Sequence, residues 1–278
     1  METVPHIPWQ LPPIRIHDAI KDEVTHMLKD QLNSWNISYS TSSYRSRMFV
    51  VIKPKGGLRS VYDLRSLNRI SIQDAMLPPN VSKFADAFIR YSIYGTLDLY
   101  SGYPQRMLHL DLRPLTTCQT LIGNLQLNTL PMGYTNSMQE FQWSTSHIIK
   151  SLIPEKALPF VDDIRVKGLR STYNNESIPE NHKICCFVWE YAHTLYTMLK
   201  LLATAGATAL GKKVVLGICK VEIVGTLCNL EGTCPMHHQQ NQLLLWREVI
   251  FRSLWRLWSS WPSSGVLKAV QWVTHTDQ

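Results

Sequence analysis

The pattern of apolar and polar residues predicts a β-hairpin early in the chain. The β-prone run Arg47–Lys53 is followed by Pro-Lys-Gly-Gly at 54–57 and by a second β-prone run, Leu58–Tyr62. Because Pro and Gly at this place favour a turn, the two runs are expected to pair as antiparallel strands. Lys55 and Arg59 make the loop and its rim basic.

Apolar residues that recur with a helical period predict further helices, and short apolar runs between them predict strands. The predicted helices cover Ile16–Leu32, Val81–Ile89, Met138–Leu152 and His182–Ala205. Ser137 and Glu140 have the spacing of a capping box at the start of the third helix. Gly206 favours an end to the fourth. The predicted strands cover Ile93–Leu99, Ala157–Val161, Ile164–Lys167, Lys212–Leu216 and Val221–Thr226.

Composition favours a folded protein over a disordered one. Of the 278 residues, 45% are hydrophobic and 18% are charged, which excludes intrinsic disorder as the overall description. The six cysteines are too few for a disulfide scaffold in a chain of this size. No apolar run approaches the roughly 20 residues of a membrane span, and residues 1–13 lack a secretory signal. We therefore expect an intracellular protein that is neither secreted nor membrane-bound.

Positive charge is concentrated in one part of the chain. The formal net charge is +7, and the segment 41–120 holds eleven basic residues against five acidic ones. Such a segment is consistent with binding to phosphate backbones. A solvated basic face is an equally good interpretation of the charge alone.

The last part of the chain has a different composition. Residues 236–278 hold five of the nine tryptophans, amid Ser and Leu. We therefore expect this segment to be a divergent tail, and we hypothesise that it is out-of-frame or decayed coding sequence.

Two acidic positions associated with strands are candidates for chemistry. Asp98 lies near the end of one predicted strand, and Asp162 and Asp163 lie where two predicted strands turn. Acidic side chains among apolar strands are costly unless a cation compensates them, and hard cations such as Mg²⁺ prefer carboxylate oxygens. Taken alone, an Asp-Asp pair is more simply a turn former.

Several ordered motifs change that interpretation. They are Arg59–Asn68, Thr96–Gln105, Leu130–Ser137, Phe160–Asp163, Gly211–Lys213 and Val221–Gly225. Together these motifs resemble the reverse transcriptases. The closest resemblance is to the polymerase of gypsy-type LTR retrotransposons, especially the fungal kind, and it covers about residues 41–235. The tail stands where that family has its thumb, so the thumb is expected to be truncated or degenerate.

The resemblance implies an α+β fold, the fingers and palm of a right-hand polymerase, with a small antiparallel palm sheet backed by helices. It places Asp98 and the Asp-Asp hairpin on adjacent strands. The implied fingers are about 41–90 and 106–130, and the implied palm is about 91–105 and 131–235. Residues 1–40 are expected as a lead-in and 236–278 as the divergent tail.

The implied activity is RNA-directed DNA synthesis by transfer of nucleotides from dNTPs to a primer. The implied partners are an RNA or DNA template and a DNA or tRNA-type primer, and the implied cofactors are two Mg²⁺ ions, for which Mn²⁺ can substitute. The resemblance assigns catalysis to Asp98, Asp162 and Asp163. It assigns the metal sites to the same three side chains and the carbonyl group of Leu99.

The resemblance also implies residues that bind the nucleotide and the primer. Tyr103 matches the aromatic residue that excludes a 2′-hydroxyl, although an ordinary core tyrosine is the alternative. Lys55 and Arg59 match residues that hold the triphosphate, and Met132 and Gly133 match the loop that touches nucleotide and template. The primer-grip region matches Ile223, Val224 and Gly225.

Other interpretations are weaker. The run Gly206–Lys212 fits the first part of a P-loop, but Lys213 stands where that motif needs a hydroxyl. Cys228, Cys234 and the histidines 237–238 lack the tight pairs typical of a zinc site. The rival that stays open is a catalytically inactive, nucleic-acid-binding remnant of a retrotransposon polyprotein.

Overall fold

A computed structural model describes residues 3–54, 56–76, 80–99, 103–209, 211–223 and 225–235. The chain divides into two compact units, each assembled from two segments. Unit 1 comprises residues 1–76 and 101–141, and unit 2 comprises residues 77–100 and 142–278. The predicted bounds of fingers and palm differ from this division at 77–90, 101–105 and 131–141, and those two names stay predictions.

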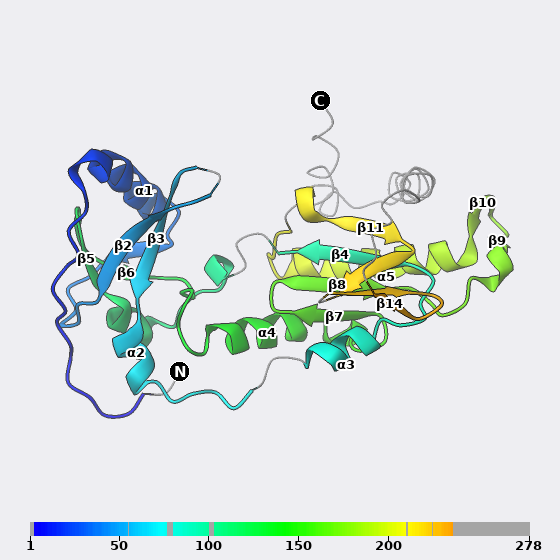
Figure 1. The fold of residues 1–278 in the computed structure, drawn as a ribbon, viewed down its shortest axis with the longest axis horizontal. Coiled ribbons are helices and arrows are strands. Elements are labelled where there is room, and N and C mark those ends of the chain that lie inside the picture. Colours follow the sequence, from blue (N-terminus) through cyan, green and yellow to red (C-terminus); the bar gives the residue numbers. More distant parts are fainter. Residues whose placement is uncertain are drawn as a thin grey trace. The chain divides into compact units, whose positions relative to one another are not determined.

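Unit 1 contains a three-stranded sheet, β1-β6-β5, and the two-stranded hairpin β2-β3 (Figure 1). The hairpin was predicted from the sequence, and its register pairs Val51 with Arg59. The elements are η1 (Asp18–Ile20), α1 (Lys21–Asn33), β1 (Ile37–Tyr39), β2 (Arg47–Ile52), β3 (Leu58–Asp63), α2 (Arg65–Ile70), η2 (Tyr103–Gln105), η3 (Leu110–Thr116), β5 (Cys118–Thr120) and β6 (Gly123–Leu127).

The first 40 residues pack within unit 1. Val24 and Leu28 of α1 and Ile37 of β1 are almost fully buried, in one core with Met48 and Leu125. Burying each such side chain contributes roughly 1.5–3 kcal/mol to stability. The segment that was expected as a lead-in therefore supplies a helix and a strand to this core.

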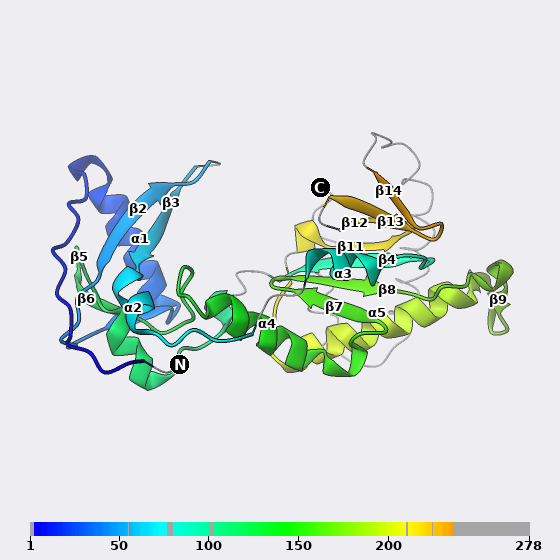
Figure 2. The ribbon, with the colours of Figure 1, turned by 60° about the horizontal axis from the view of Figure 1, so that its bottom comes forward.

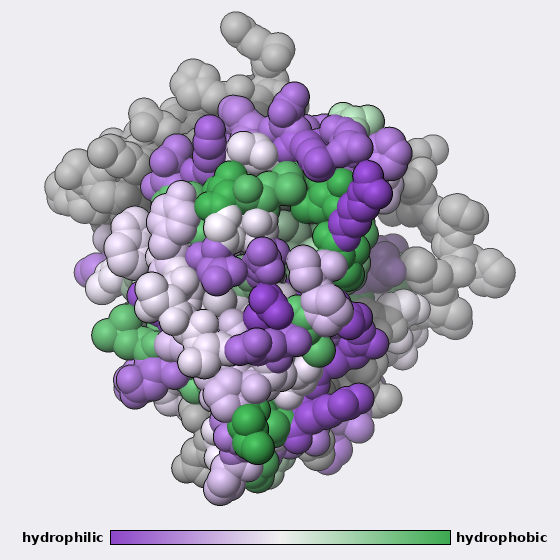
Figure 3. Space-filling view, turned by 90° about the vertical axis from the view of Figure 1, so that its left-hand side faces the viewer, coloured by the Kyte–Doolittle hydropathy of each residue, from purple (hydrophilic) through white to green (hydrophobic). Residues whose placement is uncertain are grey.

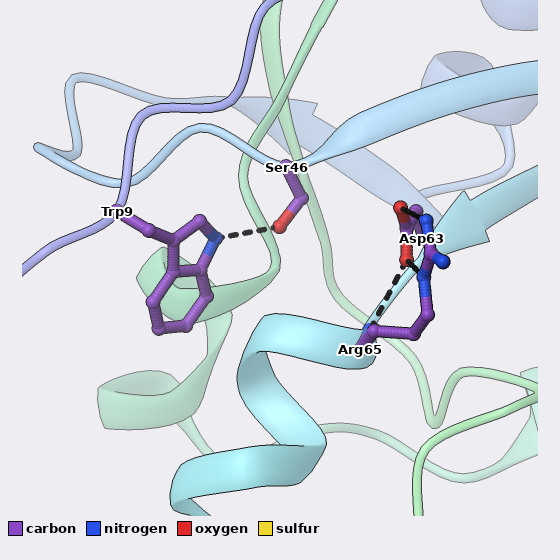
Figure 4. Close-up of polar contacts among 4 residues, drawn as sticks. All are labelled: Trp9, Ser46, Asp63 and Arg65. Atoms are coloured by element: carbon purple, nitrogen blue, oxygen red, sulfur yellow. Dashed lines mark hydrogen bonds and ion pairs between the residues drawn. The ribbon is translucent and has the colours of Figure 1, made fainter.

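Hydrogen bonds and an aromatic contact hold the N-terminal segment against the rest of unit 1. The indole nitrogen of Trp9 donates a hydrogen bond of 2.9 Å to the Ser46 hydroxyl (Figure 4). The Trp9 ring also meets the Tyr44 ring edge-on, with ring centroids 4.7 Å apart. Leu11 and Arg45 also exchange hydrogen bonds, from the Leu11 amide to the Arg45 carbonyl and from the Arg45 side chain to the Leu11 carbonyl. The extended segment before α1 is thus fixed in place.

Not all apolar side chains of unit 1 are buried. Ile7, Ile52 and Leu110 are between two-thirds and nine-tenths exposed. The face drawn in Figure 3 mixes hydrophilic residues with a hydrophobic band and smaller hydrophobic areas. That face is therefore not uniformly hydrophilic.

Unit 2 is built on a four-stranded antiparallel sheet in the order β11-β4-β8-β7. Its elements are α3 (Val81–Asp86), β4 (Tyr94–Asp98), η4 (Lys150–Leu152), β7 (Ala157–Phe160), β8 (Asp163–Lys167), η5 (Tyr173–Asn175), β9 (Ser177–Ile178), β10 (Asn181–Cys185), α5 (Cys186–Thr204), η6 (Gly211–Lys213), β11 (Val215–Ile218), β12 (Lys220–Ile223), β13 (Thr226–Asn229) and β14 (Thr233–Pro235). Helix α4 (Ser137–Ile148) begins in unit 1 and continues in unit 2.

Helices back this sheet, as the α+β prediction requires. Figures 1 and 2 show α5 running along one side of the sheet. Tyr191 of α5 is fully buried, and a side chain at Gly95 of β4 would collide with its hydroxyl. Glycine at this position therefore lets the helix approach the strand closely. In the described part of the chain, no helix is long and apolar enough to span a membrane.

Three predictions about element boundaries were wrong. The helix predicted from His182 begins at Cys186, because residues 181–185 form β10. The Ser137 hydroxyl donates to the Pro131 carbonyl instead of forming a capping box. Lys212 and Lys213 belong to the 3₁₀ turn η6 and not to a strand.

Candidate active site

The pairing of β4 with β8 brings two of the predicted acids together. Asp98 is the last residue of β4 and Asp163 the first residue of β8, and the register places them directly opposite each other. Directly opposed residues of antiparallel strands have Cβ atoms about 4.5–5.5 Å apart. The prediction that Asp98 and the Asp-Asp hairpin lie on adjacent strands is therefore confirmed.

The third acid lies in the tight turn between β7 and β8. Phe160 pairs with Asp163, so the two turn residues are Val161 and Asp162, one position earlier than predicted. Val161 has a φ of +56°, which is rare and costly for a β-branched residue. The amide of Leu99 donates to the Asp162 carbonyl at 2.9 Å, which ties the turn to the end of β4.

The buried side chain of Gln142, on α4, holds this turn from behind. Its carbonyl oxygen accepts a 2.6 Å hydrogen bond from the Val161 amide, and its nitrogen donates to the Pro159 carbonyl at 3.0 Å. The side chain thereby satisfies backbone groups on both sides of Phe160. We infer that these two bonds help to stabilise the strained turn that carries Asp162.

Basic side chains accompany two of the acids. The Lys213 ammonium group, on η6, lies 2.6 Å from Asp98 Oδ2, and the Lys213 side chain is 60% exposed. Arg165, on β8, lies 3.0 Å from Asp163 Oδ2 and donates a second hydrogen bond of 2.7 Å to Thr96 Oγ1 on β4. The Arg165 side chain is only 20% exposed.

The electrostatics of the cluster show excess negative charge. Burial raises the pKa of Asp163 above its usual range, and the charges of Asp162 and Asp98 raise it further, against the opposing effect of Arg165 and Lys213. The hydrogen bond and charge of Asp98 raise the pKa of Lys213 in turn. The contributions of the neighbouring acids to both shifts indicate a place where additional positive charge would be stabilising.

The donor set fits a hard divalent cation. Carboxylate oxygens from Asp98, Asp162 and Asp163 and the backbone carbonyl group of Leu99 are the ligand type that Mg²⁺ prefers. Lys213 already supplies a positive charge at the Asp98 carboxylate. Within the described ranges, however, no three Asp, Glu, His or Cys side chains converge as a ready-made metal site. Asp98 and Asp163 instead face their basic partners.

The predicted nucleotide-binding residues lie in unit 1. Arg59 is exposed on β3, beside the hairpin loop, and Lys55 lies outside the described residues. Tyr103 stacks on Phe141 with ring centroids 5.1 Å apart. Met132 is 60% exposed, and Gly133 has a φ of +86°, a conformation that favours glycine.

Asn68 fixes the loop that contains Met132 and Gly133. Its side-chain nitrogen donates to the Gly133 carbonyl and its oxygen accepts from the Thr135 amide, both at 2.9 Å. This side chain thus connects α2 to the loop on both sides of Tyr134, and the loop conformation depends on it.

The predicted primer-grip region lies at the turn between β12 and β13. Ile223 is 1% exposed and belongs to a core with Phe84 and Phe88, so its side chain supports the hairpin from inside. Gly225 has a φ of +80° in the turn, and Val224 lies outside the described residues. Cys228, considered for a zinc site, is fully buried in the same core.

Reasoning from the sequence missed three residues of this site. Gln142 gave no signal, because a glutamine within a helix is usually a solvated residue. Arg165 lies in a predicted strand and was not singled out as a site residue, and Lys213 was noted only as part of the Gly-Lys-Lys motif. Their roles depend on cross-strand and long-range contacts that no local pattern encodes.

Comparison with known proteins identifies the fold. The chain has the fold of reverse transcriptases. A foamy viral protease-reverse transcriptase in complex with an RNA/DNA hybrid superimposes with a TM-score of 0.67 and 20% identity, over 82% of this chain and 28% of that one. The same kind of enzyme in complex with dsDNA gives a TM-score of 0.67 and 21% identity, over 91% and 51%.

The sequence is similar to the Pol polyproteins of retrotransposons. It is 27% identical over 225 residues to that of transposon gypsy of Drosophila melanogaster, which covers 78% of this chain and 20% of the relative. It is 28% identical over 174 residues to that of transposon 297, which covers 61% and 16%. The predicted resemblance to retrotransposon reverse transcriptases is therefore confirmed.

A shorter relative is an RNA-directed DNA polymerase homolog of Oenothera berteroana, 27% identical over 121 residues, which cover 44% of this chain and 85% of the relative. No protein-family model matches the chain. The chain spans only 13–20% of the length of four transposon polyproteins that it matches.

Proposed function

We propose that this chain is an RNA-directed DNA polymerase whose catalytic centre is the acidic end of the β4–β8 pair. The observation that carries the proposal is the direct opposition of Asp98 and Asp163, with Asp162 in the adjoining turn, on a reverse transcriptase fold. The excess negative charge there supports a site for cations that neutralise a triphosphate.

The proposed reaction is nucleotidyl transfer. The 3′-hydroxyl oxygen of a primer forms a bond to the α-phosphorus of a dNTP, the bond from that phosphorus to the bridging oxygen breaks, and pyrophosphate leaves. Reverse transcriptases generally use divalent metal ions, and here two Mg²⁺ ions, or Mn²⁺, would supply activation of the hydroxyl and stabilisation of the leaving group. Asp98, Asp162 and the Leu99 carbonyl would hold them, with Asp163 as the third acid.

The chain's own residues then position the reactants. Asp98 and Asp162 hold their oxygens at the end of a sheet, where the strand register and the Gln142 contacts fix the backbone. Arg59, and Lys55 beside it in the sequence, would neutralise the triphosphate. Tyr103 would exclude a 2′-hydroxyl, and Met132 and Gly133 would touch the nucleotide and the template. Positioning and charge neutralisation are most of what phosphoryl transfer needs from a protein.

The proposed partners follow from the same chemistry. They are an RNA or DNA template, a DNA or tRNA-type primer, and dNTPs. Foamy viral enzymes with this fold have been captured with RNA/DNA hybrid and with dsDNA, which supports nucleic acid as the partner. The primer would lie at the β12–β13 turn that includes Gly225.

A second candidate is an inactive nucleic-acid-binding remnant. It is favoured by the pairing of Asp98 with Lys213 and of Asp163 with Arg165, which leaves no three acids converging among the described residues. Such a protein would bind nucleic acid in a salt-sensitive way without incorporating nucleotides.

Primer extension on an RNA template tests the proposal. With dNTPs and Mg²⁺ or Mn²⁺, the unaltered chain should extend the primer, and Asp98→Asn and Asp162→Asn should abolish extension. Glu155→Gln, an exposed acid of unit 2, is the matched control and should keep it. A chain that circular dichroism shows to be folded, and that binds nucleic acid but extends no primer, would establish the remnant instead.

A further inference from the structure

Glu140 makes a contact that its place in the sequence did not indicate. Its spacing from Ser137 predicted a capping box, but its carboxylate, on α4, accepts a hydrogen bond of 3.0 Å from the guanidinium group of Arg106. Arg106 directly follows the 3₁₀ turn η2. The two side chains are 44% and 41% exposed. This ion pair therefore connects the start of α4 to the end of η2 at the surface of unit 1.

The same two segments share a second contact, between aromatic rings. Tyr103, the first residue of η2, stacks on Phe141, which follows Glu140 in α4, and the two ring planes are 27° apart. The amide of Arg106 donates to the Tyr103 carbonyl at 3.0 Å. Each partner of the ion pair is thus joined through the backbone to one of the stacked rings, so the ion pair restrains the position of the rings.

The backbone on the far side of Arg106 is fixed independently. The Arg106 carbonyl accepts a 2.8 Å hydrogen bond from the Leu130 amide, and Met107 forms a β-bridge with Thr129. A 3₁₀ turn of three residues has little internal hydrogen bonding, so its orientation depends on contacts with its surroundings. The ion pair and the ring stack are two such contacts, and both connect η2 to α4.

We propose that the Arg106–Glu140 ion pair determines how strongly this chain discriminates against ribonucleotides, because it holds the Tyr103 ring in place against Phe141. This inference rests on the proposed function, in which Tyr103 excludes a 2′-hydroxyl. Arg106 and Glu140 act through Tyr103 and are therefore positioning residues. A side chain excludes a group by steric contact only as far as its own neighbours keep it from moving.

Nucleotide selectivity tests the inference. Single-nucleotide extension with a dNTP and with the matching rNTP gives kcat/KM for each. Glu140→Gln keeps the shape and removes the charge, so it should raise kcat/KM for the rNTP by about threefold, a modest effect because the pair is exposed, and leave that for the dNTP within about twofold. Arg106→Met should act in the same way. Asp18→Asn, which breaks the exposed 2.6 Å ion pair with Lys21 in unit 1, is the matched control and should leave the ratio unchanged.

Two comparisons show whether the pair acts through its charge and through Tyr103. Raising the salt concentration from about 0.05 M to about 0.5 M screens an exposed pair, so the ratio in the unaltered chain should approach that of Glu140→Gln, which itself should change little. Weaker nucleic-acid binding affects both nucleotides alike and cancels in the ratio. Tyr103→Val combined with Glu140→Gln should give the ratio of Tyr103→Val alone, because the restrained ring is then absent.

The position of the ring can also be followed without catalysis. With 3-fluorotyrosine in place of Tyr103, the fluorine chemical shift reports whether the ring is stacked on Phe141. Glu140→Gln and Arg106→Met should move this shift toward the value that Phe141→Leu gives, and Asp18→Asn should not move it. Circular dichroism confirms the fold of each variant.

The outcomes separate this inference from the proposed function. If the ratio is unchanged in Glu140→Gln and Arg106→Met, or if these variants lower kcat/KM for both nucleotides equally, the inference is wrong while the polymerase stands. If the unaltered chain extends a primer with neither nucleotide, the proposed function fails and the inference about selectivity fails with it. The fluorine signal then still shows whether the ion pair holds the ring.

Discussion

Each unit contains an aspartate paired with the arginine two residues later, and the two pairs behave in opposite ways. In unit 1, Asp63 at the end of β3 accepts two hydrogen bonds from the Arg65 side chain, at 2.8 and 2.7 Å (Figure 4). In unit 2, Asp163 pairs with Arg165 at 3.0 Å. The hydrogen bonds of Arg65 lower the pKa of Asp63, whereas burial raises the pKa of Asp163 despite Arg165.

The pKa values of the two aspartates shift in opposite directions because of their surroundings, since both have an arginine partner. Asp63 also accepts a hydrogen bond from the backbone amide of Arg65, and its largest influences all favour the ionised form except burial. Asp163 is surrounded by the charges of Asp98 and Asp162, which oppose its ionisation. The first pair is therefore a local structural contact, while the second belongs to a cluster that has more negative charge than its own cations relieve.

The largest expected effect is catalytic and is confined to unit 2. Asp98→Asn should lower primer extension by at least about 100-fold, because it removes a ligand and a charge at the reacting centre. Asp63→Asn should leave extension within about threefold, because Asp63 takes part only in a local contact of unit 1. Steady-state extension assays on both purified variants measure this. Equal losses in the two would contradict the contrast between the units.

Substrate choice should depend on unit 1. Tyr103→Val should raise incorporation of ribonucleotides relative to deoxynucleotides by about tenfold or more, since a smaller side chain leaves room for the 2′-hydroxyl. Competition between dNTPs and rNTPs in single-nucleotide extension gives the ratio. Phe141→Leu, which removes only the ring stacked on Tyr103, is expected to shift the ratio less. An unchanged ratio in Tyr103→Val would instead make Tyr103 an ordinary core residue.

The arrangement of the acids was predicted partly from local patterns and partly from the resemblance. The strand-forming runs placed Asp98 at the end of one strand and the acidic pair between two others, and the resemblance placed those strands side by side, as the pairing of β4 with β8 shows. The turn was misplaced by one residue, because its position depends on Val161 adopting a positive φ, which its residue type disfavours.

Other features could not be predicted because they depend on contacts between distant segments. The bond from Arg165 to Thr96 follows from which residues face each other across β4 and β8. The strand Asn181–Cys185 continues directly into α5, so the apolar period of the helix masked the boundary. The role of Gln142 depends on a turn that lies 19 residues further along the chain.

Two glutamines of α4 provide a test of what supports the acidic turn. Gln142→Leu should destabilise the protein by about 2 kcal/mol, because it leaves the Val161 amide and the Pro159 carbonyl without their partner. It should also lower extension several-fold, because the turn that carries Asp162 loses its support. Urea unfolding and extension assays measure the two effects.

The matched change is Gln139→Leu in the same helix. The Gln139 side-chain oxygen is buried and has no hydrogen-bond partner among the described residues, so its replacement should be neutral or slightly stabilising. If Gln139→Leu were as destabilising as Gln142→Leu, the loss would come from the helix and not from the turn.

The smallest expected effect is on the pH dependence of stability in the absence of metal. Measuring it is also the most direct test of the two Asp–Arg pairs. Asp63 has a lowered pKa, so its stabilising contribution is complete above the ordinary value of 3.8 and is lost as the pH falls through the folded-state pKa. Asp163 has a raised pKa, so its favourable contribution is complete below 3.8 and is lost as the pH rises through the folded-state pKa.

Thermal unfolding in EDTA from about pH 2.5 to 7 should therefore give slopes of opposite sign. The melting temperature of the unaltered chain relative to Asp63→Asn should fall on acidification below 3.8, by about 2 °C in all. Relative to Asp163→Asn it should fall as the pH rises above 3.8. Removing Asp98 as well should flatten the second slope, because the charge that opposes ionisation of Asp163 is then smaller. Two slopes of the same sign would mean that Arg165 outweighs burial and the neighbouring acids in setting the pKa of Asp163.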